Sequence, residues 1–238
     1  PPEREYESTY GGLFAPGEIR IVGDVLLDET ALGGSASCGT DGCHPDITRQ
    51  WESSTHRHSG TNPFYRFAVE RMAEMYGPAA TRLCLACHEP GTLAAGLVDA
   101  NAEPNLALRA EGVSCMACHA VVAVHDAPAM GVPANGSPTY DPSFSLELGD
   151  GSAPPDELQL GLHATAMDKN RRLLKSNRFC AACHQFFIPP GLAGKRPQRL
   201  RLQEAEAAGT PYGDPKHPDF VSCVDCHMPR VKAEDGTD

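Results

Sequence analysis

The chain has 238 residues and a formal net charge of −11, with 41 % hydrophobic but only 6 % aromatic residues. Such an acidic balance argues against nucleic-acid binding, which requires clustered Lys and Arg side chains. No run of about 18 apolar residues occurs, so the sequence predicts no transmembrane segment. The 23 Gly and 21 Pro residues predict a mainly α chain of short helices, with extensive irregular loop and few or no strands.

Residues 1–33 form a predicted N-terminal arm ahead of the first cysteine. Apolar residues in the segments 19–22 and 25–27, with a Gly-Asp pair between them, predict a short strand or hairpin. Residues 34–230 follow as one predicted domain. The remaining residues, 231–238, are polar and form a predicted tail.

The first predicted helix begins with Asn62 as its N-cap and Pro63 in its first turn, and it ends at Gly77. Its apolar residues recur at near-helical spacing: Phe64, Phe67, Val69, Met72 and Met75. A second short helix starting at Ala79 is expected to lead into Cys84.

Later segments alternate between predicted loops and helices. Residues 132–155 are rich in Pro, Gly, Ser and Asp and predict a surface loop. Asp156 is a candidate N-cap for a helix that passes through His163. Residues 189–195 predict another loop, and good helix formers in 197–208 predict another helix, because a glycine follows them.

Every one of the ten cysteines belongs to a pair that is followed directly by a histidine. The five motifs are Cys38, Cys43 and His44; Cys84, Cys87 and His88; Cys115, Cys118 and His119; Cys180, Cys183 and His184; and Cys223, Cys226 and His227. C-x-x-C-H is the attachment site of c-type haem. The cysteines form thioether bonds, and the histidine is the first axial ligand of the iron. We therefore predict five covalently attached haem c groups, and no disulfide.

Structural zinc and disulfides are the competing interpretations of these cysteines. Zinc sites combine pairs into sets of four ligands, and five pairs leave one over. A disulfide framework gives no reason for a histidine after each second cysteine. The first motif has four residues between its cysteines, with Gly39 and Gly42 at the ends of this spacer. These glycines would let the extra backbone loop outward while both sulfurs reach one macrocycle.

The second axial ligand decides whether an iron is closed or open to substrate. The histidines outside the motifs also number five: His56, His58, His125, His163 and His217. Five haem motifs and five further histidines predict that each iron is held by two histidines. His125 follows the third motif by six residues, so we expect it to ligate a neighbouring haem. His58, two residues from His56, would ligate another haem or bond a propionate, and Met130 and Met167 are competing ligands.

Three segments resemble the multihaem cytochrome c family typified by tetrahaem cytochrome c-554, which is related to the haem cores of hydroxylamine oxidoreductase and pentahaem nitrite reductase. They are Trp51-Glu-Ser-Ser-Thr-His56, Glu111-Gly-Val-Ser-Cys-Met-Ala-Cys-His119 and Cys223-Val-Asp-Cys-His-Met-Pro229. Because the chain has few apolar and aromatic side chains, we expect a compact multihaem cytochrome c fold in which five covalent haems form the core. The resemblance implies that His56 and His125 are distal ligands.

The sequence departs from this family at several points. The first motif is expanded, and Ala120-Val-Val stands where Gly-Pro-Gly often follows the third motif. Nitrite reductases of the group usually carry a Lys in place of one motif histidine, whereas all five motifs here keep His. This difference argues against a nitrite reductase.

The expected function is electron transfer through closely spaced, low-potential haems between redox partner proteins such as other cytochromes, with no catalytic residue. One alternative is a small-molecule redox enzyme, acting on a nitrogen compound at a haem with an open axial position. Another is a self-assembling subunit of a cytochrome filament or a larger redox complex. Because haem is attached covalently outside the bacterial cytoplasm, we expect a periplasmic or extracellular protein whose leader is absent from this sequence.

Overall fold

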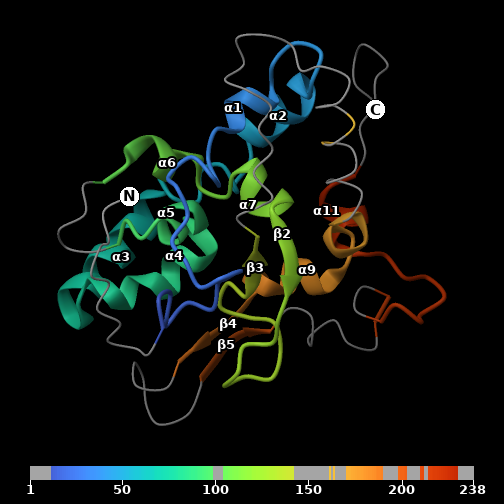
Figure 1. Cartoon of the computed structure of the whole chain (residues 1–238). Helices are drawn as coiled ribbons and strands as arrows, with labels where there is room; N and C mark the ends of the chain where they lie inside the picture. The colour runs from blue at the N-terminus through green and yellow to red at the C-terminus, as the bar shows by residue number, and fades with distance from the viewer. Residues whose placement is uncertain are drawn as a thin grey trace.

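The computed structural model describes residues 12–98, 104–141, 161, 163, 170–189, 198–202, 210–211 and 214–229. Short helices joined by irregular segments dominate this part of the chain (Figure 1). The mainly helical character predicted from the glycine and proline content is thus confirmed. None of the helices in the described ranges is long and apolar enough to cross a membrane.

Most of the helices lie between the first and third motifs. They are α1 (Ser35–Cys38), α2 (Pro45–Glu52), α3 (Pro63–Tyr76), the 3-10 helix η1 (Pro78–Thr81), α4 (Arg82–His88), α5 (Pro90–Ala94), α6 (Leu106–Glu111) and α7 (Cys115–His119). Proline starts α2, α3, η1 and α5, because its fixed φ suits a first turn where its missing N–H costs no intrahelical bond. Asn62 caps α3 by accepting bonds from two backbone N–H groups. The helix predicted between Asn62 and Gly77 is therefore confirmed, as is the short helix before Cys84.

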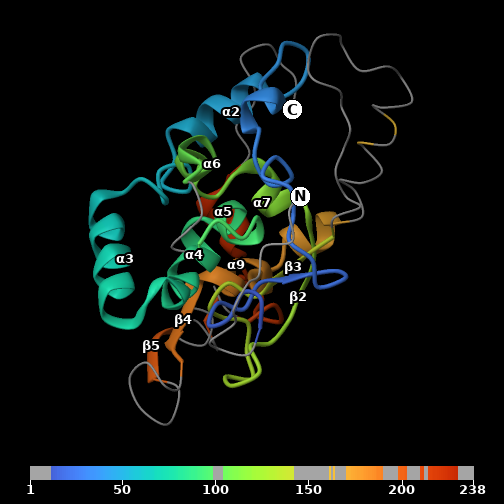
Figure 2. The ribbon, with the colours of Figure 1, turned by 60° about the vertical axis from the view of Figure 1, so that its left-hand side comes forward.

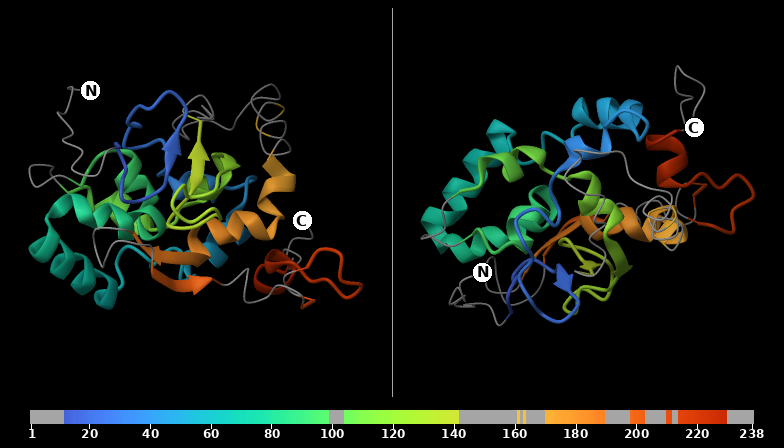
Figure 3. Two further views of the ribbon diagram at one scale, coloured as in Figure 1. Left: turned by 90° about the horizontal axis from the view of Figure 1, so that it is seen from below. Right: turned by 45° about the horizontal axis from the view of Figure 1, so that its top comes forward.

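The strands of the described residues form two small sheets. They are β1 (Arg20–Ile21), β2 (Val121–Val124), β3 (Pro138–Tyr140), β4 (Gln185–Ile188) and β5 (Gln198–Leu202). β3 lies between β1, to which it is parallel, and β2, to which it is antiparallel. β4 and β5 form an antiparallel pair. Helix α9 (Asn177–His184) leads directly into β4 and lies beside α11 (Cys223–His227) (Figures 1 and 3).

The N-terminal region and part of the predicted surface loop are interior. The strand predicted near residue 20 is present, but it pairs with the distant β3 and not with residues 25–27 in a hairpin. The prediction of a surface loop is wrong for residues 132–141, where Asn135 and Ser137 are completely buried. Asn135 compensates for its burial by donating to the Phe187 carbonyl and accepting from the Phe187 N–H. Polar composition therefore misled the prediction, because these polar groups find partners inside the protein.

The helix predicted for residues 197–208 is wrong where the structure describes this segment. Residues 198–202 form β5, whose partner is β4. Arg and Leu alternate through Gln198–Leu202. This two-residue period suits a strand, although the same residues also have good helix propensity. The pairing with β4, which ends ten residues before β5 begins, selects the strand over the helix. The proposed helix cap at Asp156 lies outside the described residues, although His163 itself is helical.

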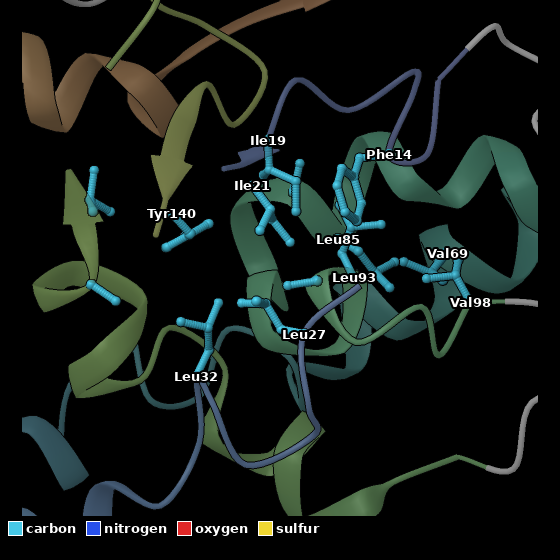
Figure 4. Packing of buried hydrophobic residues seen from close by; sticks show 14 of the residues in the cluster. Phe14, Ile19, Ile21, Leu27, Leu32, Val69, Leu85, Leu93, Val98 and Tyr140 are labelled. Atoms are coloured by element: carbon cyan, nitrogen blue, oxygen red, sulfur yellow. The ribbon is translucent and has the colours of Figure 1, made fainter. Parts of the chain in front are cut away.

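The main hydrophobic cluster joins the N-terminal segment to the helices around the second motif (Figure 4). Phe14, Ile19 and Leu27 from the N-terminal segment pack with Leu85 of α4 and Leu93 of α5. In Figure 2, α4 and α5 lie towards the middle of the molecule and α3 at its outer edge. This cluster supports α4 and thereby places one of the cysteine motifs.

Candidate functional site

Four of the motifs lie at the C-terminal ends of helices. Helices α4, α7, α9 and α11 each end at the motif histidine. Residues three and four apart share one face of a helix, so the two cysteines and the histidine lie on the same side. Ser114, Ser176 and Ser222 cap α7, α9 and α11, each accepting a bond from a backbone N–H three residues later. Capping matters here because helices this short are not stable alone.

The first motif reaches a similar arrangement with a longer spacer. The His44 N–H donates to the Cys38 carbonyl oxygen over 2.9 Å. In a motif with two spacer residues, the helix itself would make this bond between histidine and first cysteine. The extra residues form a turn closed by a bond from Cys43 N to Thr40 O, with Gly42 at a φ of 82°. The spacer therefore loops outward, as the glycines predict.

Glu111 ties the first motif to the third. Its carboxylate accepts bonds from the backbone N–H groups of Gly34 and Ser35, over 2.8 and 3.1 Å, at the start of α1. The Ser35 hydroxyl donates to the same carboxylate over 2.7 Å and accepts a bond from Cys115 N over 3.1 Å. One side chain of α6 thus positions both the helix that ends in Cys38 and the helix that begins with Cys115.

All ten cysteines are free thiols in the structure. Cys43 and Cys226 are exposed, the other eight are half-buried, and the five motif histidines are all exposed. Burial raises the pKa of Cys84 to about 11 and that of Cys118 to about 12. Cys84 and Cys118 are therefore protonated at neutral pH. Thiols and imidazoles side by side on one helix face suit covalent attachment of haem.

Two of the predicted distal ligands face motif histidines. The ring centroids of His44 and His163 are 6.0 Å apart, and those of His56 and His184 are 6.2 Å apart. A metal–nitrogen bond to imidazole is about 2 Å, and a ring centroid lies about 1 Å behind the nitrogen. Two imidazoles on opposite sides of one iron therefore have centroids roughly 6 Å apart. Both pairs have the separation that an iron between them requires.

Two other ring nitrogens are buried without a hydrogen-bond partner. They are Nδ1 of His163 and Nε2 of His125. Burial lowers the pKa of His125 to about 4, so this imidazole is neutral at physiological pH and has a lone pair available for a metal. A buried nitrogen without a partner is costly unless something binds it. Both histidines therefore fit the role of distal ligand that their sequence positions predict.

The structure pairs neither His125 nor the remaining two predicted ligands with a motif histidine. Among the described residues, no ring contact joins His58 or His217 to another histidine. His58 is exposed, and the half-buried His217 accepts a bond at Nδ1 from the Asp219 N–H over 3.1 Å. Ligation by these two residues stays a prediction.

The segment that ends with His56 is held by contacts that the sequence did not predict. Trp51 Nε1 donates to the Val113 carbonyl over 2.8 Å, and the Val113 N–H donates to the His56 carbonyl over 2.9 Å. Gly112 packs so closely that a Cβ built on it would lie 2.5 Å from the His56 carbonyl oxygen. The segments Trp51–His56 and Glu111–His119 therefore dock on each other. Both segments resemble family elements, but neither contains a sequence pattern that predicts this contact.

A buried ionic cluster lies beside the second motif. The Tyr65 ring stacks on the His88 ring with centroids 4.3 Å apart, and its hydroxyl donates to Glu89 over 2.9 Å. Glu89 is completely buried and also pairs with Arg66 and Arg109, over 2.9 and 3.2 Å. Two cations and a hydroxyl compensate for the burial of one carboxylate. The cluster fixes α4 next to α3 and restricts the orientation of the His88 ring.

Residues 37–120 match the family model of cytochrome c554 and c-prime. This part of the chain belongs to a c-type cytochrome family. The match covers about a third of the chain, including the first three motifs and both segments that dock at Gly112. Searches of the curated proteins and of the solved structures gave no match. The family implies covalently bound haem c and electron transfer, and the residues present fit that cofactor.

Proposed function

We propose that the chain is an electron-transfer protein with five covalently bound haem c groups, held mostly or entirely by pairs of histidines. The observation that carries the proposal is the separation of about 6 Å in the pairs His44–His163 and His56–His184. Each pair joins a motif histidine to one predicted distal ligand. This separation supports the binding of one iron between two side chains from distant parts of the sequence.

The chain's residues determine what such a site can do. Haem, when bound, supplies reversible one-electron chemistry at its iron. Two histidines that held one iron would leave no coordination position for a substrate and would favour a low potential compared with histidine and methionine. Helices held by caps and by Glu111 keep the ligands in place, so little geometry changes with oxidation state. These properties favour electron transfer over catalysis at an open iron.

The cellular setting follows from the same proposal. We expect an exported protein, periplasmic or extracellular, because covalent haem attachment takes place outside the bacterial cytoplasm. Redox partner proteins, including other cytochromes, would exchange electrons with it. Its net charge of −11 favours partners with a basic docking surface.

Electron paramagnetic resonance of the oxidised holoprotein tests the ligand pairs. The rings of His56 and His184 are nearly perpendicular, at 80°, whereas those of His44 and His163 are at 33°. Perpendicular ligand planes give a low-spin signal of larger g anisotropy, because they leave the iron d orbitals closer in energy. We expect His56→Ala to remove the most anisotropic low-spin signal and to create a high-spin signal. His163→Ala should instead remove a different low-spin signal.

His58→Ala is the matched control, because it lies in the same segment and faces no motif histidine in the structure. It should leave the most anisotropic signal unchanged. An unaltered spectrum in His56→Ala or His163→Ala would show that the pairing is wrong. Intact-mass measurement of the wild-type holoprotein should show five haem additions, and a smaller number would contradict the proposed count. A high-spin signal in the wild type that binds cyanide or nitrite would favour a redox enzyme instead.

A further inference from the structure

Contacts between the cysteine pairs do not follow the order of the motifs in the chain. Cys38 of the first motif lies near Cys115 of the third motif. Helices α1 and α7, which carry them, are in contact, and Ser35 at the start of α1 accepts a bond from the Cys115 N–H. The first motif therefore has the third motif as its neighbour.

The fourth motif contacts three others. The sulfur of Cys87 in the second motif lies 3.8 Å from the Cys183 carbonyl oxygen. Helix α9, which carries Cys180, contacts helix α11, which begins with Cys223 of the fifth motif. The Cys223 N–H also donates, over 2.9 Å, to the side-chain oxygen of the first residue of α9. Strand β2, which closely follows the third motif, contacts α9 of the fourth motif, and Arg178 of α9 donates to the Val124 carbonyl of β2 over 3.3 Å.

Tyr140 lies where three of these motifs meet. Its side chain is 1 % exposed, and its hydroxyl donates to the Ala117 carbonyl over 3.1 Å. Four residues earlier, the Gly136 N–H donates to the Ala182 carbonyl of the fourth motif over 2.8 Å, and a Cβ built on Gly136 would lie 2.5 Å from the Cβ of Ala86 in the second motif. Residues 136–140 therefore pack against the second, third and fourth motifs.

We infer that the five motifs form a branched arrangement whose junction is the fourth motif. The second, third and fifth motifs surround it, and the first is reached through the third. This inference rests on the proposed function only in taking each motif as a haem-binding unit. A row in chain order has two ends, whereas this arrangement has three: the first, second and fifth motifs. It therefore offers three places at which redox partner proteins can exchange electrons.

Removal of single haems from the holoprotein tests the junction. Three variants each replace both cysteines of one motif with serine. The replacements at positions 84 and 87, at 223 and 226, and at 38 and 43 would remove the second, fifth and first haem. The intact mass of each variant should show one haem addition fewer than the wild type. The reporter is the most anisotropic low-spin signal, which is the one that His56→Ala abolishes. We expect its midpoint potential to shift in the second-motif and fifth-motif variants. Electrostatic coupling between redox centres falls with distance, so the first-motif variant should cause the smallest shift.

A row in chain order predicts a different result. The second motif would then be separated from the fourth, and its removal would leave the reporter's potential as little changed as removal of the first. That outcome would overturn the junction without affecting the proposed function. If the wild-type holoprotein has no such low-spin signal, or if its intact mass shows no haem addition, the proposed function itself is contradicted.

Anomalous X-ray scattering from iron in wild-type crystals gives a second test, which does not depend on maturation of the variants. The iron bound by His184 should have, as its nearest neighbours, the irons bound by His88, His119 and His227. If the iron bound by His88 lies instead between those bound by His44 and His119, the motifs follow chain order and the inference is wrong.

Discussion

At the residue scale, the positions of the candidate ligands depend on side chains that bind no haem. Gly112 is the clearest example, because its φ is 56° and its α-carbon approaches the backbone of the segment that carries His56. Only glycine combines such a φ with so close a contact. The backbone at Gly112 therefore decides how near His56 can come to His184.

Gly112→Ala should lower the free energy of unfolding by roughly 2–4 kcal/mol, because it adds both backbone strain and a steric clash. The new Cβ would lie 2.5 Å from the His56 carbonyl oxygen and 2.6 Å from Ser59 Oγ. Displacement of His56 should also weaken the most anisotropic low-spin signal. Chemical denaturation and paramagnetic resonance measure the two effects.

Gly131→Ala separates backbone strain from the clash. Gly131 has a φ of 69°, but no atom lies within 4 Å of a Cβ built there. We expect a loss of about 1 kcal/mol and an unchanged spectrum. Equal losses of stability in the two variants, with both spectra intact, would contradict the positioning role of Gly112.

At the element scale, the motif helices are too short to be stable without tertiary contacts. Their caps therefore carry a large share of their local stability. Ser114 both caps α7, by accepting from the Ala117 N–H over 2.9 Å, and donates to the Leu32 carbonyl. It is buried, so its removal leaves two backbone groups without partners.

Ser114→Ala should destabilise the protein by about 1–2 kcal/mol through the lost cap and the unpaired carbonyl. Thermal unfolding of the holoprotein is the measurement. Ser53→Ala is the control, because Ser53 is exposed and donates to the Gln50 carbonyl within the same turn. It should change stability by less than about 0.5 kcal/mol. A Ser114→Ala variant as stable as this control would show that the cap is dispensable.

At the scale of the whole molecule, net charge governs encounters with partners. The chain carries −11, which creates a field that attracts basic surfaces and repels acidic ones. Salt screens this field over a Debye length of about 10 Å at 0.1 M. Association with a redox partner should therefore depend on the sign of the partner's charge.

The second-order rate of electron exchange with a small basic redox protein should fall by roughly tenfold between about 10 mM and about 200 mM salt. Stopped-flow absorbance of the haem bands measures this rate. An acidic redox protein of similar size provides the comparison, and its rate should rise over the same range. A rate with the basic protein that does not change with salt would show that docking is not steered by net charge.

Local signals predicted the local structure well. The N-cap Asn62, the proline after it and the terminal Gly77 predict α3 correctly, because a helix of this length is specified by its own residues. The segments 132–141 and 198–202 were predicted wrongly. The first contains the strand β3 at Pro138–Tyr140 and the second is the strand β5, and a strand is stabilised by a partner that is distant in the sequence. Polarity and helix propensity within the segment contain no information about that partner.

The sequence by itself determined the chemistry of this protein: cysteine pairs followed by histidine specify covalent haem, because the attachment reaction needs only residues a few positions apart. It also identified His56 and His163 as candidate ligands. Only the tertiary structure decided which motif histidine each of them faces, and that the fourth motif lies among three others. These relations join residues that are distant in the chain, and they arise from packing and hydrogen bonds that the spacing of a motif does not encode.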